Sequence, residues 1–251
     1  MELSLWFVIL LLGTGFVAGI INTLAGGGSN LTLPALMILG LPADVANATN
    51  RLGVFMQSIV GIRGFHKKDQ LPAHDLKSIL IPTLMGGLVG AVAASYLPPQ
   101  NLKPILLGTM ILMSLVILVR PSIVFPGPLE HSQLVRESPK AWWTLFIAGL
   151  YGGFVQAGVG FVLIAAIAGG LRYDIVKANA LKMFCTGAFT AVALGVFIFR
   201  GQVSWVPGVV LALATMAGAQ VGVKLALKVS PGFMKWFLFL MTVAASIAAW
   251  L

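Results

Sequence analysis

The stretch Leu24-Ala25-Gly26-Gly27-Gly28-Ser29-Asn30 interrupts an otherwise apolar N-terminal region. Three consecutive glycines cannot continue a helix inside hydrocarbon unless other groups satisfy the freed backbone hydrogen bonds. A second interruption, Gln156-Ala157-Gly158-Val159-Gly160, lies 130 residues further along the chain. These two stretches, the first and second breaks, predict a membrane protein of discontinuous helices with its functional site at the breaks.

Both breaks belong to a duplication. Residues 14–48 align without a gap on residues 144–178, with eleven identities in 35 positions, where roughly three are expected by chance. At a shift of 132, Gly86-x-x-x-Gly90 matches Gly218-x-x-x-Gly222. Small residues four positions apart let helix backbones approach closely in lipid, so we expect packing contacts there more than a substrate-lining face.

The composition places the chain in the bilayer. Of its 251 residues, 59% are hydrophobic and 9% charged, with a mean hydropathy of +0.98, too little charge for the surface of a soluble domain. The net charge of +9 could suit nucleic acid, but the sixteen Lys and Arg lie mainly in short connections between apolar runs. We therefore expect a lipid bilayer, and no nucleic acid, as a partner.

The apolar segments span residues 5–24, 31–40, 45–62, 76–97, 102–119, 142–157, 159–170, 176–199, 203–227 and 233–251. Segments 31–40 and 159–170 are too short to cross a bilayer, because ten helical residues advance about 15 Å. Each is either the lower part of a kinked helix or a half-helix that enters the membrane and turns back. A polar linker, residues 121–140, separates the first repeat (residues 1–120) from the second (residues 141–251).

Charge bias favours inverted halves. If each half crosses an odd number of times, residues 63–77, 120–140 and 224–235 share the cytoplasmic side and carry ten Lys and Arg. Four simple crossings per half would leave no bias. The positive-inside rule therefore predicts two repeated four-segment halves in inverted orientation, with the N-terminus outside. Residues 172–182 fit neither scheme cleanly.

The first break has the features of an anion site. Ser29 or Asn30 is suited to cap the helix that follows, so its free N–H groups and positive dipole end would face the membrane interior. The alternative is a kink that serves only close helix packing. Because the second break lies at the matching position, we favour a site.

Polar residues and cations open the next long helix of each half. They are Asn47-Ala48-Thr49-Asn50-Arg51 and Lys177-Ala178-Asn179-Ala180-Leu181-Lys182. A buried cation is costly in lipid and should face a cavity or a partner. We favour the site for Arg51 over snorkelling to the headgroups; for Lys182 both stay open, and Lys177 is expected to snorkel.

The predicted substrate-binding residues are Gly26, Gly27, Gly28, Ser29, Asn30, Thr49, Asn50, Arg51, Gln156, Gly158, Gly160, Asn179 and Lys182. Asp44 and Asp174 precede these helices at matched positions, and we expect them to act as caps. Cys185 is the only cysteine, expected as a small buried apolar residue. No catalytic, cofactor-binding or metal-binding motif is present, so we expect neither an enzyme nor a cofactor.

The segment Ala25–Pro34 and the motif Ala46–Arg51 resemble the sulfite exporter TauE/SafE family of membrane proteins, and the likeness extends over nearly the whole chain. The second copy departs from it, with Gly158-Val159-Gly160 and with Ile164 where the first copy has Pro34. Asn50 stands where the family usually has serine. The resemblance implies transport of sulfite, sulfonates or other small sulfur-containing anions across the bacterial inner membrane.

Together these features predict an all-α, multi-pass integral membrane transporter that exports a small sulfur-containing anion by alternating access. A passive anion channel is the alternative, and a membrane-embedded enzyme or assembly factor a weaker one. The sequence leaves open the coupling ion and whether two chains associate as a homodimer.

Overall fold

The computed structural model describes residues 5–72, 75–119, 134–135 and 138–226, and the regular structure within them is helical. The helices are α1 (Leu5–Leu24), α2 (Ser29–Ile38), α3 (Ala43–His66), α4 (Leu76–Ser95), α5 (Pro99–Val119), α6 (Pro139–Phe154), α7 (Val159–Ile164), the π-helical η4 (Ala165–Gly170), α8 (Ile175–Phe199) and α9 (Trp205–Leu225). The predicted segment 233–251 lies outside the described residues.

Four of these helices, α1, α4, α8 and α9, are long and apolar enough to cross a membrane. The two short segments appear as α2 and as α7 continued by η4. Large apolar side chains such as Trp6, Met85 and Leu213 are exposed on the outer helices, as lipid-facing residues are. The prediction of an all-α, multi-pass integral membrane protein is confirmed.

Each short helix turns back along the helix before it. Leu36 and Leu39, at the end of α2, pack against Leu11 near the start of α1, so the two helices run in opposite directions. In the second half, Ile167 of η4 belongs to the same cluster as Ala141 at the start of α6. Of the two alternatives for the short segments, the half-helix that turns back is therefore correct; the turns occupy residues 25–28 and 155–158.

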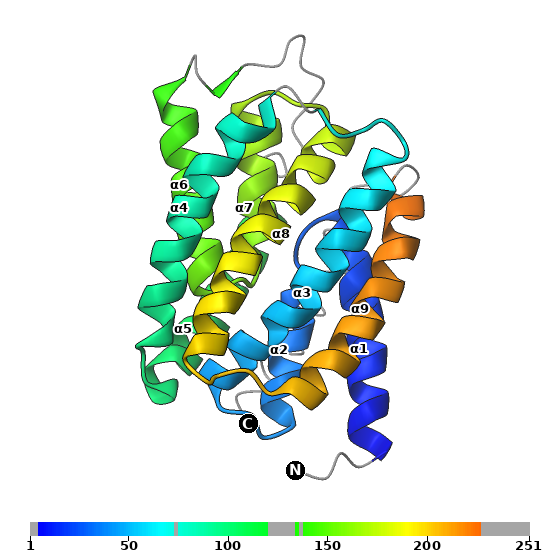
Figure 1. Ribbon diagram of the computed structural model, residues 1–251, viewed down its shortest axis with the longest axis vertical. Helices are drawn as coiled ribbons and strands as arrows, with labels where there is room; N and C mark the ends of the chain where they lie inside the picture. Colours follow the sequence, from blue (N-terminus) through cyan, green and yellow to red (C-terminus); the bar gives the residue numbers. More distant parts are fainter. Residues whose placement is uncertain (1–4, 73–74, 120–133, 136–137, 227–251) are drawn as a thin grey trace.

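The two halves are interleaved: α1 lies along α9, α6 lies along α4, and α3 contacts α8 at the centre (Figure 1). Glycines make these approaches close. A Cβ added at Gly86 of α4 would collide with the carbonyl oxygen of Phe146 in α6, and one at Gly218 of α9 with that of Phe16 in α1. Gly86 and Gly218 are equivalent in the repeat, and so are Phe16 and Phe146. The packing role expected for the glycine motifs is confirmed.

The equivalent helices α3 and α8 run in opposite directions. The first turns of α3 lie beside the connection that follows α8: Gln202 Nε2 donates to Asp44 Oδ2 at 3.3 Å, and the Ser204 amide donates to Thr49 Oγ1 at 3.0 Å. In Figure 1 the α3–α4 connection lies at the top and the α8–α9 connection at the bottom. Inverted halves would give this arrangement.

Most of the cationic residues outside the candidate site belong to helix ends and connections at the end of the molecule that holds the α3–α4 connection (top of Figure 1). By their positions at the helix ends, the cations of this end are Arg63, Lys67, Lys68, Lys77, Lys140, Arg172, Lys177 and Lys224. Among the described residues, the opposite end carries only Lys103 and Arg200. The positive-inside rule thus predicts a cytoplasmic cation-rich end, and the structure adds Arg172 and Lys177 to it.

Cysteine labelling tests this orientation. In a Cys185→Ala background, we expect Gln100→Cys to react with a membrane-impermeant maleimide in intact cells. Lys68→Cys should react only after permeabilisation, because both side chains are exposed at opposite ends. The unmodified chain is the control, since its cysteine is buried. The reverse pattern would contradict the orientation.

A second prediction concerns the glycine contacts. Gly86→Ala and Gly218→Ala should each lower the thermal stability of the detergent-purified protein, because the methyl group meets backbone atoms that cannot move aside alone. The expected cost is about 1–3 kcal/mol, as for other overpacked sites. Gly13→Ala is the matched control, with nothing within 4 Å of its added Cβ. Equal melting temperatures for all three variants would refute the packing role.

Candidate functional site

The two breaks meet inside the molecule. A Cβ added at Gly26 would collide with the backbone of Gly160, and one at Gly160 with the backbone of Gly26. The glycines of both breaks are buried. The structure therefore brings Gly26 and Gly160, one from each half, together, whereas Gly28 packs against Ala18 and Asn22 of α1 and Gly158 lies beside Met113 of α5.

Gly26 and Gln156 are equivalent in the repeat, and both have a positive φ, +94° and +66°. Glycine adopts this conformation freely, whereas a residue with a Cβ does so at a cost of about 1–2 kcal/mol. A strained non-glycine residue at such a turn indicates that its side chain is needed there. Oε1 of Gln156 accepts hydrogen bonds from Arg51 at 2.6 Å and from Thr190 at 3.3 Å.

Arg51 projects from α3 into the second break, and its side chain is 0% exposed. Nη1 donates to the carbonyl oxygen of Gly152 at 2.6 Å and to Gln156. Nη2 donates to the carbonyl oxygen of Gly153 at 2.7 Å and, more weakly, to that of Phe154 at 3.4 Å. The guanidinium thus binds the last carbonyl oxygens of α6, which the break leaves without helical partners.

Lys182 does the same for the other half. Its side chain is 1% exposed, and Nζ donates to the carbonyl oxygens of Asn22 at 2.8 Å and Thr23 at 3.1 Å, in the last turn of α1. Nζ also donates to Asn179 Oδ1 at 2.7 Å. At the shift of 130, Asn22 and Thr23 are the equivalents of the glycines that Arg51 binds. Each half therefore caps the broken first helix of the other.

Arg51 and Lys182 have no carboxylate partner among the described residues. The ion pair found in that part of the chain joins Lys177 to Asp174 at the surface, at 3.2 Å. The Arg51 guanidinium also lies over the ring of Phe197, 5.3 Å from its centre. Nε of Arg51 and Nε2 of Gln57 are buried and make no hydrogen bond within the described part of the chain. The site thus combines excess positive charge with one unused N–H donor, Nε of Arg51.

Asn50 joins α3 to the half-helix α2. Its Nδ2 donates to Ser29 Oγ at 3.0 Å, and its Oδ1 accepts from Thr32 Oγ1 at 2.6 Å. Thr49 points elsewhere and accepts from the amide of Ser204. Of the predicted residues in the Asn47–Arg51 motif, Asn50 and Arg51 therefore face the breaks, and Thr49 holds the α8–α9 connection.

The predicted cap of α2 is wrong. The helix begins at Ser29, so the cap position falls on Gly28 and no side chain caps the first turn. The Ser29 hydroxyl is bound by Asn50 instead. The amides of Gly27, Gly28 and Ser29 have no backbone partner within the described residues, and Asn30 is buried beside them.

One of the two aspartate caps is confirmed. Asp174 accepts from two amides of the first turn of α8. Asp44 does not cap α3, because that helix begins one residue earlier, at Ala43. Its carboxylate instead accepts the hydrogen bond from Gln202.

Sequence reasoning missed several partners in the site. Asn47 lies one turn before Arg51 and donates to the carbonyl oxygen of Phe154 at 2.9 Å. Its position four residues from a buried cation is a signal that could have marked it. The carbonyl acceptors at the ends of α1 and α6 carry no side-chain signal, so only the structure identifies them.

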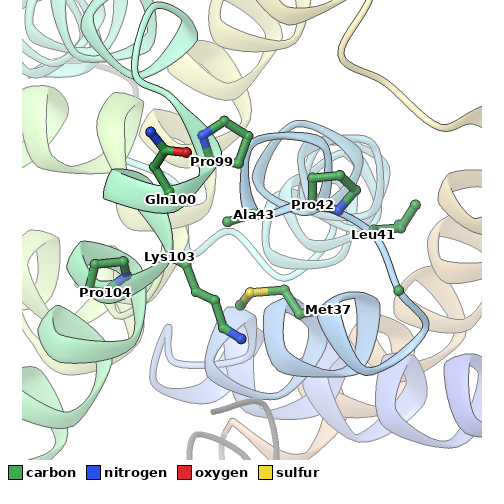
Figure 2. Close-up of a pocket in the computed structure, with 9 residues that line it drawn as sticks. Met37, Leu41, Pro42, Ala43, Pro99, Gln100, Lys103 and Pro104 are labelled. Atoms are coloured by element: carbon green, nitrogen blue, oxygen red, sulfur yellow. The ribbon is translucent and has the colours of Figure 1, made fainter. Parts of the chain in front are cut away.

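A pocket of about 680 Å³ lies apart from this site, at the cation-poor end of the molecule. It is lined by residues of α2, α5, the α2–α3 connection and the start of α3, and Lys103 extends into it (Figure 2). The candidate site itself is closed, with its polar side chains buried. Within the described residues, no group of three or more His, Cys, Asp or Glu could hold a metal ion.

A sequence model described as "Sulfite exporter TauE/SafE" matches residues 11–249. The probable membrane transporter protein YfcA of Escherichia coli K12 is 30% identical over 222 residues, 87% of this chain and 81% of its own length. A probable membrane transporter protein of Sinorhizobium sp, ORF9, is 26% identical over 246 residues, 98% of this chain and 93% of its own. A probable membrane transporter protein of Haemophilus influenzae is 25% identical over 225 residues, covering 90% and 87%. Because the family model matches almost the entire sequence, this multi-pass membrane protein belongs to the sulfite exporter TauE/SafE family of transporters.

Proposed function

We propose that the chain exports a small sulfur-containing oxyanion, sulfite or an organosulfonate, across the bacterial inner membrane by alternating access. One observation carries the proposal: Arg51 and Lys182, both buried, come from opposite halves and have no carboxylate partner within the described residues. A buried charge without a counter-ion is destabilising by several kcal/mol. A bound anion supplies that counter-ion.

The charge balance favours one small anion. Each helix C-terminus that a cation caps contributes about half a negative charge, and the start of α2 about half a positive one. Added to the two unit charges of Arg51 and Lys182, these partial charges leave a net positive charge of roughly one to one and a half at the site. A small anion neutralises this excess, whereas a bulky polyanion would exceed it.

The hydrogen-bond donors favour an oxyanion. Nε of Arg51 is a buried donor without a partner in the described residues, and such a donor costs about 1–3 kcal/mol. Sulfite and sulfonate groups present several acceptor oxygens to such donors. The description of the family, a sulfite exporter, supports the same class.

The interleaving of the halves supports alternating access. We infer an inverted repeat, because the equivalent helices α3 and α8 run in opposite directions. Arg51 and Lys182 each connect one half to the other. An anion that accepts hydrogen bonds from either cation would weaken these connections and let the halves rock about the site. In this scheme the chain moves its substrate without transforming it.

Anion binding can be measured as thermal stabilisation of the purified protein. Sulfite or methanesulfonate should raise the melting temperature, and at 100 times Kd the stabilisation is about 2.7 kcal/mol. Arg51→Met and Lys182→Met should each abolish this anion-dependent shift. Lys177→Met is the matched control, since that cation lies at the surface and its loss should leave the shift intact.

Transport in proteoliposomes completes this test. A carrier predicts saturable flux that unlabelled substrate on the opposite side accelerates. Both site variants should lower flux at least tenfold. An anion-dependent shift that survives in Arg51→Met and Lys182→Met would remove both cations from the site. Flux without saturation or trans-acceleration would indicate a channel.

Gln156 offers a test that separates binding from folding. Gln156→Gly relieves the positive-φ strain, worth about 1–2 kcal/mol, but removes the acceptor for Arg51. We expect transport to fall while the melting temperature stays within a few degrees of the wild-type value. Gln156→Ala keeps the strain and should be the less stable of the two variants. Full transport by Gln156→Gly would show that the side chain has no part in the site.

A further inference from the structure

The 680 Å³ pocket contains a charge that the central site does not use. Its walls are mostly apolar, and Lys103 is the charged residue among those that line it. The side chain of Lys103 forms no ion pair or hydrogen bond within the described residues. Gln100 lies three residues earlier on α5, so both polar side chains share one helix face. Figure 2 shows the lysine side chain extending across the pocket toward Met37.

We propose that this pocket is an anion-binding vestibule, in which Lys103 holds the transported anion between the outer solution and the two breaks. The inference rests on the proposed function, because it takes the same ligand. It assigns a second, weaker binding site and a role to Lys103 that the central site does not provide.

The position of the pocket supports this assignment. Ala43 in its wall is the first residue of α3. Asn47 and Arg51 follow it by four and eight residues, which is about 6 and 12 Å along the helix. Met37 in the opposite wall belongs to α2, whose first residue, Ser29, lies at the first break. The pocket therefore lies about 12 Å along α3 from Arg51 and about 12 Å along α2 from the first break.

An apolar layer separates the pocket from the breaks. Leu33 of α2, Ala43 of α3 and Leu106 of α5 pack in one buried cluster with Val155 and Ala157 of the second break. Movement of α5 away from α2 and α3 would open a path from Lys103 to Arg51. In the structure described, this layer closes the path.

Charge placement gives a second argument. Lys103 lies at the cation-poor end, where a positive charge works against the orientation set by the other end. Arg200, the other cation at this end, is positioned by the ring of Tyr96, 4.4 Å from its guanidinium carbon. Lys103 has no such partner and faces a pocket. A small anion fits this single charge and amide better than a protein partner, which would need a larger surface.

Cysteine chemistry at Gln100 tests the vestibule. In a Cys185→Ala background, Gln100→Cys is labelled with anionic and cationic methanethiosulfonate reagents. A positive charge about 6 Å from the thiol in water raises the rate of the anionic reagent about threefold and lowers that of the cationic reagent about threefold. Lys103→Gln should therefore lower the anionic-to-cationic rate ratio about tenfold. Arg200→Gln removes the same charge from the same end and is the matched control, with an unchanged ratio expected.

Protection gives the second readout. Methanesulfonate, which does not react with these reagents, should slow the labelling of Gln100→Cys when Lys103 is present but not in Lys103→Gln. A ratio insensitive to Lys103→Gln overturns the proposal. So does protection by vesicles containing anionic lipid but not by methanesulfonate, which would make the pocket a lipid headgroup site.

These outcomes are distinguishable from a failure of the proposed function. The central site is tested by the anion-dependent thermal shift and its dependence on Arg51, whereas labelling at Gln100 requires no transport. In right-side-out vesicles, Lys103→Gln should raise the external anion concentration that gives half-maximal flux about threefold and leave the maximal flux unchanged. Lys103→Arg should restore the wild-type value, and a failure to do so would count against a charge effect.

Discussion

Each half of this protein contributes a buried cation that binds the last carbonyl oxygens of the broken first helix of the other half. Inside a bilayer no water can satisfy those carbonyl groups, and each unsatisfied group costs several kcal/mol. Neither half can therefore complete its own broken helix. This requirement agrees with the packing of α1 against α9 and of α6 against α4, in which each broken helix lies against the opposite half.

The two caps and the proposed anion site draw on the same N–H groups. All four terminal hydrogens of Arg51 point at protein oxygens in the structure described, and only Nε has no partner there. An anion must compete with helix carbonyls that carry partial negative charge. Such competition suits a transporter, because the protein-bound and anion-bound arrangements then differ by a small free energy that binding can reverse.

The duplicated halves have diverged at the turn where they matter most. The first copy has Gly26 in the left-handed conformation, and the second has Gln156 at the equivalent place, with its side chain bound to Arg51. One turn is relaxed and serves close contact with Gly160; the other is strained and carries a polar group. The two sides of the site are therefore chemically unequal although the backbones are alike, which lets one half bind differently from the other.

Much of this could be read from the sequence. Composition placed the chain in lipid because so few charged residues cannot cover a soluble domain, and the lengths of 31–40 and 159–170 ruled out full crossings. The repeat predicted paired breaks, and Arg51 stood out because a buried guanidinium is costly. The cap of α2 was misjudged because a tertiary hydrogen bond from Asn50 takes the Ser29 hydroxyl. Only the tertiary structure paired Arg51 and Lys182 with carbonyl groups of the opposite half. Backbone oxygens are the same in every residue, so which of them a distant cation binds is decided by how the helices pack.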